Sequence, residues 1–98
     1  MNHAMDAPCY EFRLYVAGDA ENSRLAAENL HALCAERLPQ RHRIEVVDVL
    51  QDPKRAFADG IFMTPTLIKL APAPQRKIIG SLSERKVVLL TLGLEAGH

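Results

Sequence analysis

Apolar and polar side chains alternate along residues 10–16 (YEFRLYV), which is the two-residue period of a β-strand. The period then lengthens to that of a helix with one apolar stripe. The stripe consists of Ala26, Leu30, Leu33, Cys34 and Leu38. We expect Asp19 to be the N-cap of this helix and Pro39 to end it, because a residue before proline avoids helical backbone angles.

Residues 43–50 (RIEVVDVL) are almost continuously apolar, a pattern that favours a strand covered on both faces. A strand, a helix and a strand at this spacing predict a right-handed βαβ unit with parallel strands. Asp52 and Pro53 have the residue types of an N-cap and a first helical position, and Gly60 can end the short helix that they begin.

The next stretch predicts two more strands. Residues 65–70 form the third, and the prolines of residues 71–74 (APAP) turn the chain. Residues 75–80 (QRKIIG) then return as a fourth, antiparallel strand. With a last helix behind them, the order βαβαββα predicts an α/β protein with a thioredoxin-like fold, in which helices cover both faces of a mixed four-stranded sheet.

The last helix, residues 86–94, carries conflicting local preferences. Ser81 and Glu84 stand at capping-box spacing ahead of it, and Ser83 is the competing N-cap. The run KVVLLTL within it is rich in β-branched and apolar residues and suits a strand equally well. Gly93 is expected to weaken a helix here by about 0.5–1 kcal/mol relative to alanine.

A chain of 98 residues holds one hydrophobic core, so we expect a single domain over residues 10–94. Residues 1–9 are expected to form a flexible N-terminus and residues 95–98 a tail. The 12 Lys and Arg residues balance the 12 Asp and Glu residues, which disfavours a nucleic-acid partner. No segment approaches the roughly 20 apolar residues of a membrane helix, and the N-terminus lacks a signal-peptide pattern. We therefore expect a cytoplasmic protein that binds neither nucleic acid nor membrane.

Thr64-Pro65-Thr66, ahead of an apolar run, is similar to the proline loop that faces the active site of thiol-redox proteins. Such enzymes carry a reactive cysteine where the first strand meets the first helix, because the helix N-terminus lowers the pKa of the thiol. Here that junction (AGDAENS, residues 17–23) contains no cysteine, and Ser23 lacks a base. A glutaredoxin-like oxidoreductase is therefore disfavoured, and no catalytic residue is predicted.

The remaining candidate chemistry has simpler explanations. Cys34 lies on the apolar stripe, so we interpret it as a buried structural thiol, and two distant cysteines, Cys9 and Cys34, make no disulfide framework. His31 and Cys34 are three residues apart, but no second pair accompanies them, so neither a metal nor a cofactor is expected. Asp59 is expected on the surface. Tyr15, on the charged face of its strand, is either a surface aromatic that covers a neighbour or a contact residue.

Seven short blocks carry a family resemblance: LYVAG (14–18), Asn22-Ser23, DVL (48–50), Pro53, TPTL (64–67), IIG (78–80) and LSER (82–85). Together they resemble the KaiB family of circadian clock proteins. The resemblance implies a non-enzymatic regulator that binds a KaiC-like ATPase and modulates its phosphorylation and ATPase cycle. It also implies fold switching to a KaiB ground-state fold with a rearranged C-terminal half, which self-associates into a dimer or tetramer. A stand-alone sensor module that acts on a histidine kinase in trans is the alternative.

Under this resemblance, two groups of residues are expected to act. The partner-binding group is Gln51, Asp52, Lys54, Arg55 and Gly60. The fold-switch group, with the expected cis-proline, is Pro65, Pro72, Pro74, Thr91 and Gly93. The chain departs from the cyanobacterial clock form at Glu45, Gln51 and Gly60, where lysine is common, so we expect a divergent member of the family.

Overall fold

The computed structural model describes residues 8–95. Its elements are β1 (Tyr10–Val16), α1 (Glu21–Arg37), β2 (His42–Asp48), α2 (Pro53–Ala58), β3 (Thr66–Ala71), β4 (Arg76–Ile79) and α3 (Arg85–Leu92). The predicted order βαβαββα is confirmed. The expected flexible N-terminus (residues 1–9) and tail (residues 95–98) lie almost entirely outside the described residues. No helix within residues 8–95 is long and apolar enough to cross a membrane.

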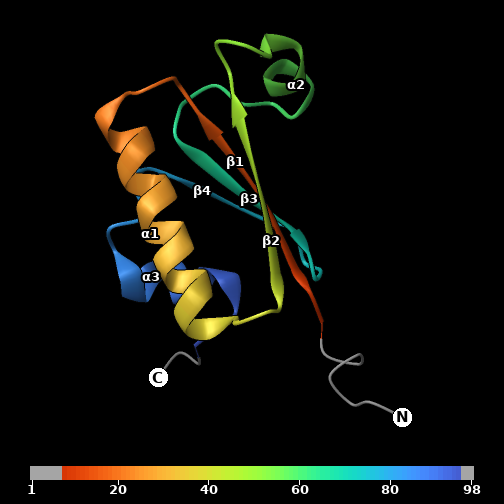
Figure 1. Cartoon of the computed structure of the whole chain (residues 1–98). Coiled ribbons are helices and arrows are strands. Elements are labelled where there is room, and N and C mark those ends of the chain that lie inside the picture. The colour runs from red at the N-terminus through yellow and green to blue at the C-terminus, as the bar shows by residue number, and fades with distance from the viewer. Residues whose placement is uncertain (1–7, 96–98) are drawn as a thin grey trace.

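The four strands form one mixed sheet in the order β2-β1-β3-β4. β1 and β2 run parallel, as the βαβ pattern predicts, whereas β3 is antiparallel to both β1 and β4. In Figure 1, α1 and α3 lie against the sheet together, and α2 stands at one end of it. Helix α2 contributes Ala56 to a separate buried cluster on the other face, with Tyr15, Val47 and Ile68. Helices therefore cover both faces, but unequally.

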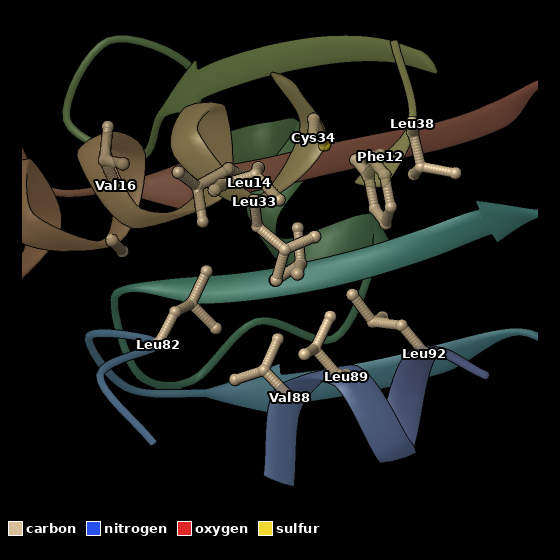
Figure 2. Packing of buried hydrophobic residues seen from close by; sticks show 13 residues of the cluster. Phe12, Leu14, Val16, Leu33, Cys34, Leu38, Leu82, Val88, Leu89 and Leu92 are labelled. Atoms are coloured by element: carbon tan, nitrogen blue, oxygen red, sulfur yellow. The ribbon is translucent and has the colours of Figure 1, made fainter. Parts of the chain in front are cut away.

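The larger core lies between the sheet and the helices α1 and α3 (Figure 2). Strand β1 contributes Phe12, Leu14 and Val16, since alternate side chains of a strand point to the same face. The whole predicted apolar stripe of α1 and its C-cap is buried, as expected. Helix α3 contributes Leu89 and Leu92, among others, so the segment with conflicting preferences is helical here.

The expectation that the second strand is covered on both faces is wrong. β2 is an edge strand, and Val46 is 49% exposed. Val47 is buried, but the strand ends at Asp48, so that Leu50 lies in a turn. A nearly continuous apolar run does not by itself place a strand inside a sheet, because an edge strand with one covered face can carry the same residues.

Of the N-caps predicted for the first two helices, one is formed. Asp52 caps α2 by accepting the Arg55 N–H at 3.4 Å, with Pro53 as the first helical residue. Asp19 does not cap α1: the N-cap is Ala20, which makes no side-chain hydrogen bond. Asp19 lies one residue too early, in the turn that brings the Ala20 N–H to the Ala17 carbonyl.

Both ends of α3 differ from the prediction. Its N-cap is Glu84, and neither the capping box nor the Ser83 cap forms; instead the hydroxyls of Ser81 and Ser83 hydrogen-bond each other at 2.7 Å. Gly93 lies outside the helix as its left-handed C-cap, with φ of 75°. The expectation that Gly93 weakens the helix is therefore wrong, because a glycine in this conformation ends a helix without strain on a Cβ atom.

Candidate protein-docking face

The predicted fold-switch residues fall into two separate groups. Pro65 stands at the entry to β3, and Pro72 and Pro74 follow its end; the bonds before all three prolines are cis. Thr91 and Gly93 lie in and after the last turn of α3, where the Thr91 hydroxyl donates to the Val87 carbonyl at 2.7 Å. The prolines therefore lie at the two ends of β3, and Thr91 and Gly93 lie at the C-terminal end of α3.

The junction of β1 with α1, where a thiol-redox enzyme carries its cysteine, is built from structural hydrogen bonds. Ser23 is buried, and its hydroxyl accepts the Ala17 N–H at 3.0 Å. Asp48 accepts the Gly18 N–H at 3.1 Å and the Leu50 N–H at 2.9 Å. The side chains of Ser23 and Asp48 therefore hold the loop through its backbone N–H groups.

The cysteines differ in their surroundings. Cys34 is fully buried, and burial raises the pKa of its thiol to about 11, so the interpretation as a structural thiol is confirmed. Cys9 is exposed. His31 is exposed on α1, whereas the Cys34 thiol is buried. In the part of the chain that the structure describes, no group of three or more His, Cys, Asp or Glu side chains is placed to hold a metal ion.

The α2 end of the sheet carries four large exposed apolar side chains, which we call the apolar patch. Leu50 before α2 is 71% exposed, Phe57 on α2 is 83% exposed, and Phe62 and Met63 after α2 are 90% and 61% exposed. A cavity of about 170 Å³ opens at the patch, lined by Val49, Ala56, Ile61, Phe62, Met63 and Thr64. Large apolar side chains exposed together are typical of a protein-interaction surface.

Sequence reasoning missed the apolar patch. The available clue was that Phe57 and Phe62 lie outside the predicted strands and outside any helical stripe. An apolar residue that belongs to no periodic pattern can be either exposed or buried in the core. The sequence alone does not distinguish the two cases, because exposure depends on the tertiary fold.

The five predicted partner-binding residues all lie within or beside α2 but differ in what they do. Gln51 and Lys54 are exposed next to the apolar patch. Asp52 is the cap of α2, and the guanidinium of Arg55 is engaged by a carboxylate of β2. Gly60 has φ of 69° and follows the end of the helix. The structure therefore brings the five residues together, with Gln51 and Lys54 as the exposed polar side chains of the group.

Beneath α2, five residues form a polar network that joins the helix to the sheet. The buried Tyr15 hydroxyl donates to Asp59 Oδ2 at 2.5 Å, and the Arg55 carbonyl lies 3.1 Å away as a second acceptor. The Arg13 guanidinium donates to Asp59 at 3.0 Å and to Glu45 at 2.9 Å. The Arg55 guanidinium donates twice to Glu45, at 2.7 and 2.9 Å.

Two expectations about this region are wrong. Tyr15 is neither a surface aromatic nor an exposed contact residue, since it is completely buried. Asp59 is not a plain surface carboxylate, because it accepts hydrogen bonds from two side chains of β1. Tyr15 was misplaced because the charged residues of β1 made this face of the strand look solvent-exposed, whereas α2 covers it.

The ionisation of the network follows from these contacts. Burial, and then the hydrogen bond to Asp59, raise the pKa of Tyr15 to about 12. The Arg55 guanidinium, followed by that of Arg13, lowers the pKa of Glu45 to about 2. The Tyr15 hydroxyl and then Arg13 lower the pKa of Asp59. Tyr15 is therefore neutral and both carboxylates are ionised at neutral pH.

Comparisons with known proteins agree with this architecture. Residues 13–94 match the KaiB domain. The chain is 40% identical to "Circadian clock protein KaiB3" of Synechocystis sp. over 92% of this chain and 88% of that protein. It is 45% identical to "Circadian clock oscillator protein KaiB" of Microcystis aeruginosa over 87% of this chain and 82% of that protein.

Solved structures show the fold alone, because their sequence identity is low. The N-terminal domain of Synechococcus elongatus SasA superposes with a TM-score of 0.72 at 18% identity, covering 94% of this chain and 90% of that one. Chloroplastic thioredoxin z superposes with a TM-score of 0.72 at 20% identity, covering 97% of this chain and 86% of that one. The predicted thioredoxin-like fold is therefore confirmed.

Proposed function

The chain belongs to the KaiB family, and we propose that it is a non-enzymatic regulator that binds a KaiC-like ATPase and modulates its phosphorylation and ATPase cycle. Its relatives are circadian clock proteins, which supports a role as a clock regulator. The docking element is the end of the molecule that carries α2. The regulator acts by contact, since the β1–α1 junction has no thiol for chemistry of its own.

The observation that carries this proposal is the apolar patch. Phe57 and Phe62 are more than four-fifths exposed, and they lie on α2 and on the loop that follows it. Buried aromatic anchors supply much of the affinity of protein interfaces, and a cavity beside them can accept an apolar side chain from the partner. Gln51 and Lys54 at the rim of the patch then contribute mainly to orientation and association rate.

Replacement of the exposed aromatics tests the docking face. Phe57→Ser with Phe62→Ser removes both anchors, and its affinity for a purified KaiC-like ATPase should fall by at least about tenfold in a calorimetric titration. The matched control is Val87→Ser with Leu90→Ser, which removes two other exposed apolar side chains, 56% and 37% exposed, on helix α3 at the other face of the sheet. Equal affinities for the two double variants would refute docking through the patch.

The second part of the proposal is exchange of the C-terminal half with a self-associated form, a dimer or tetramer. Helix α3 has eight residues, no side-chain N-cap bond and no acidic residue in its first turn. Arg85 and Lys86 stand at its N-terminus instead, where the helix dipole disfavours positive charge. The local preference of this segment for a helix is therefore weak, and tertiary packing maintains it.

NMR spectra recorded over a range of protein concentrations test this exchange. We expect two sets of peaks for residues of the C-terminal half, with the second set growing as concentration rises. The peaks of β1 and β2 should change less, because the pairing of these two strands lies within the N-terminal half. A single set of peaks at every concentration, together with a monomeric sedimentation profile, would reject the self-associated form.

A further inference from the structure

Resting on the proposed function, we propose that Glu45 and Asp59 are positioning residues of the docking face. They form a polar clamp with Arg13, Tyr15 and Arg55, and the clamp holds α2 and the loop after it in the geometry that the partner meets. Neither carboxylate lies in the apolar patch. Each acts through α2, which carries Phe57, and through the loop after it, which carries Phe62 and Met63.

The apolar attachment of α2 is thin. The helix has six residues, and Ala56 is the one that is buried. An isolated helix of this length is not stable in water, since it makes too few internal hydrogen bonds to offset nucleation. Burial of one alanine methyl supplies little of the missing free energy. Other contacts must therefore determine where α2 lies.

The first of these contacts ties the C-terminal end of α2 to the central strand β1. Tyr15 Oη lies 2.5 Å from Asp59 Oδ2 and 3.1 Å from the carbonyl oxygen of Arg55. Arg13, two residues earlier on the same face of β1, reaches the same Asp59 oxygen at 3.0 Å. Because the phenol is buried and the contact is short, the end of the helix has one favourable position.

The second contact ties the side of α2 to the edge strand β2. Glu45 stands beside Arg13 in the parallel register and accepts its Nε–H at 2.9 Å. The same carboxylate accepts the forked pair of hydrogen bonds from Arg55. Two guanidinium groups, one on the sheet and one on α2, thus share one carboxylate. A bidentate pair of this kind restricts orientation as well as distance.

The clamp also reaches the apolar patch through the backbone. Asp59 directly follows α2, and its carbonyl accepts a hydrogen bond from Lys77 Nζ at 2.9 Å. The next residues run through Gly60 into the loop that presents Phe62 and Met63. A displacement of Asp59 therefore moves the helix and the loop on both sides of the cavity together.

Isosteric amides test the clamp with the full chain. In Asp59→Asn and Glu45→Gln, amide hydrogen exchange of residues 56–60 should become about tenfold faster, because local opening loses charged hydrogen bonds. The Tyr15 phenol, followed by its ultraviolet absorbance, should titrate below its pKa of about 12 in Asp59→Asn. The matched control is Glu36→Gln, which removes a surface carboxylate paired with Arg37 and Arg85 and should leave both readouts unchanged.

Affinity for the KaiC-like ATPase should fall by roughly tenfold in both clamp variants and by less than twofold in the control. Unchanged exchange of residues 56–60, or faster exchange with unchanged affinity, would overturn the clamp. A wild-type chain that does not bind the ATPase would instead refute the proposed function. Hydrogen exchange and the Tyr15 titration would then still decide whether the network holds α2.

Discussion

The two faces of the sheet are held by different forces. On the face of α1 and α3, 13 buried residues form one apolar cluster. On the face of α2, the buried cluster has four residues, and the hydrogen bonds of Tyr15, Asp59 and Glu45 add to them. Apolar burial is non-directional and grows with area, whereas charge-assisted hydrogen bonds require particular atoms at particular angles.

This difference matches the role that we propose for each face. The α1–α3 face stabilises the domain, and its side chains are hidden. The α2 face leaves Phe57 and Phe62 in solvent, so few apolar contacts remain to attach the helix that carries one of them. Under the proposed function, the polar clamp positions the helix without covering the apolar side chains of the patch.

The largest expected effect is on the apolar face. Leu30→Ala removes a completely buried side chain of α1 and should lower the free energy of unfolding by about 2–5 kcal/mol. Denaturation by urea, followed by circular dichroism, measures the change. Leu50→Ala, at a position 71% exposed, is the control and should change stability by less than about 0.5 kcal/mol. Equal losses in the two variants would contradict the core assignment.

A smaller loss is expected on the α2 face. Tyr15→Phe keeps the buried ring but removes the hydroxyl that donates to Asp59, so the free energy of unfolding should fall by about 1–2 kcal/mol. The same urea denaturation measures it. A variant as stable as the wild type would show that the network adds nothing to the burial of the ring.

The C-terminal end of α3 offers the next test. Gly93→Ala places a Cβ atom at φ of 75° and should destabilise this fold by about 1 kcal/mol. The comparison is Thr91→Ala, which places alanine at an ordinary helical position and should change the free energy of unfolding less. If the self-associated form exists, Gly93→Ala should also increase its share in sedimentation experiments. A gain in stability for the monomer would contradict the left-handed C-cap.

Acid should weaken the α2 face before the apolar core. Glu45, with a pKa of about 2, and Asp59, with a lowered pKa, stabilise the fold fully above their ordinary values near 4. That contribution is lost as the pH falls from about 4.5 toward 2. The effect is small because Glu45 is half exposed and solvent screens its pairs. The unfolding free energy of Glu45→Gln should therefore fall less steeply over this range, and an identical slope would contradict the assignment.

The smallest effect concerns the thiols. In the native chain at pH 8, Cys9 should react quickly with a thiol reagent and Cys34 only after unfolding, since Cys34 is buried with a pKa of about 11. Absorbance of the released reporter measures both phases.

An assay of insulin reduction should give no turnover, and Cys34→Ser should not change that result. Turnover that vanishes in Cys34→Ser would contradict both the burial and the non-enzymatic role.

Local patterns predicted much of the fold. The stripe of α1 repeats over several turns, β1 alternates, and Asp52-Pro53 has the residue types that begin a helix, so element order and the main core followed directly. Predictions of caps were less successful. Asp19 and Ser83 are suitable residue types at nearly the right positions, but a cap depends on the backbone path of one turn, which a single residue does not determine.

The candidate site was predicted in part. The stretch from Gln51 to Gly60 was expected to bind a partner, and it does lie at the exposed end of the sheet. The roles within it were not predicted. Arg55 was expected to contact a partner, which stays a prediction, but its pairing with Glu45 was not anticipated. Phe57 was overlooked although it is exposed.

The sequence by itself determined the order of the elements, the buried stripe of α1 and the lack of a cysteine at the β1–α1 junction. Each of these features can be recognised from residues that are close together along the chain. Only the tertiary structure decided that β2 lies at an edge, that Tyr15 is buried and that Glu45 joins Arg13 to Arg55. The physical reason is separation along the chain: Arg13 and Glu45 are 32 residues apart, and Tyr15 and Asp59 are 44 apart. No local period records such a pairing, because it exists only once packing has brought α2 over the sheet.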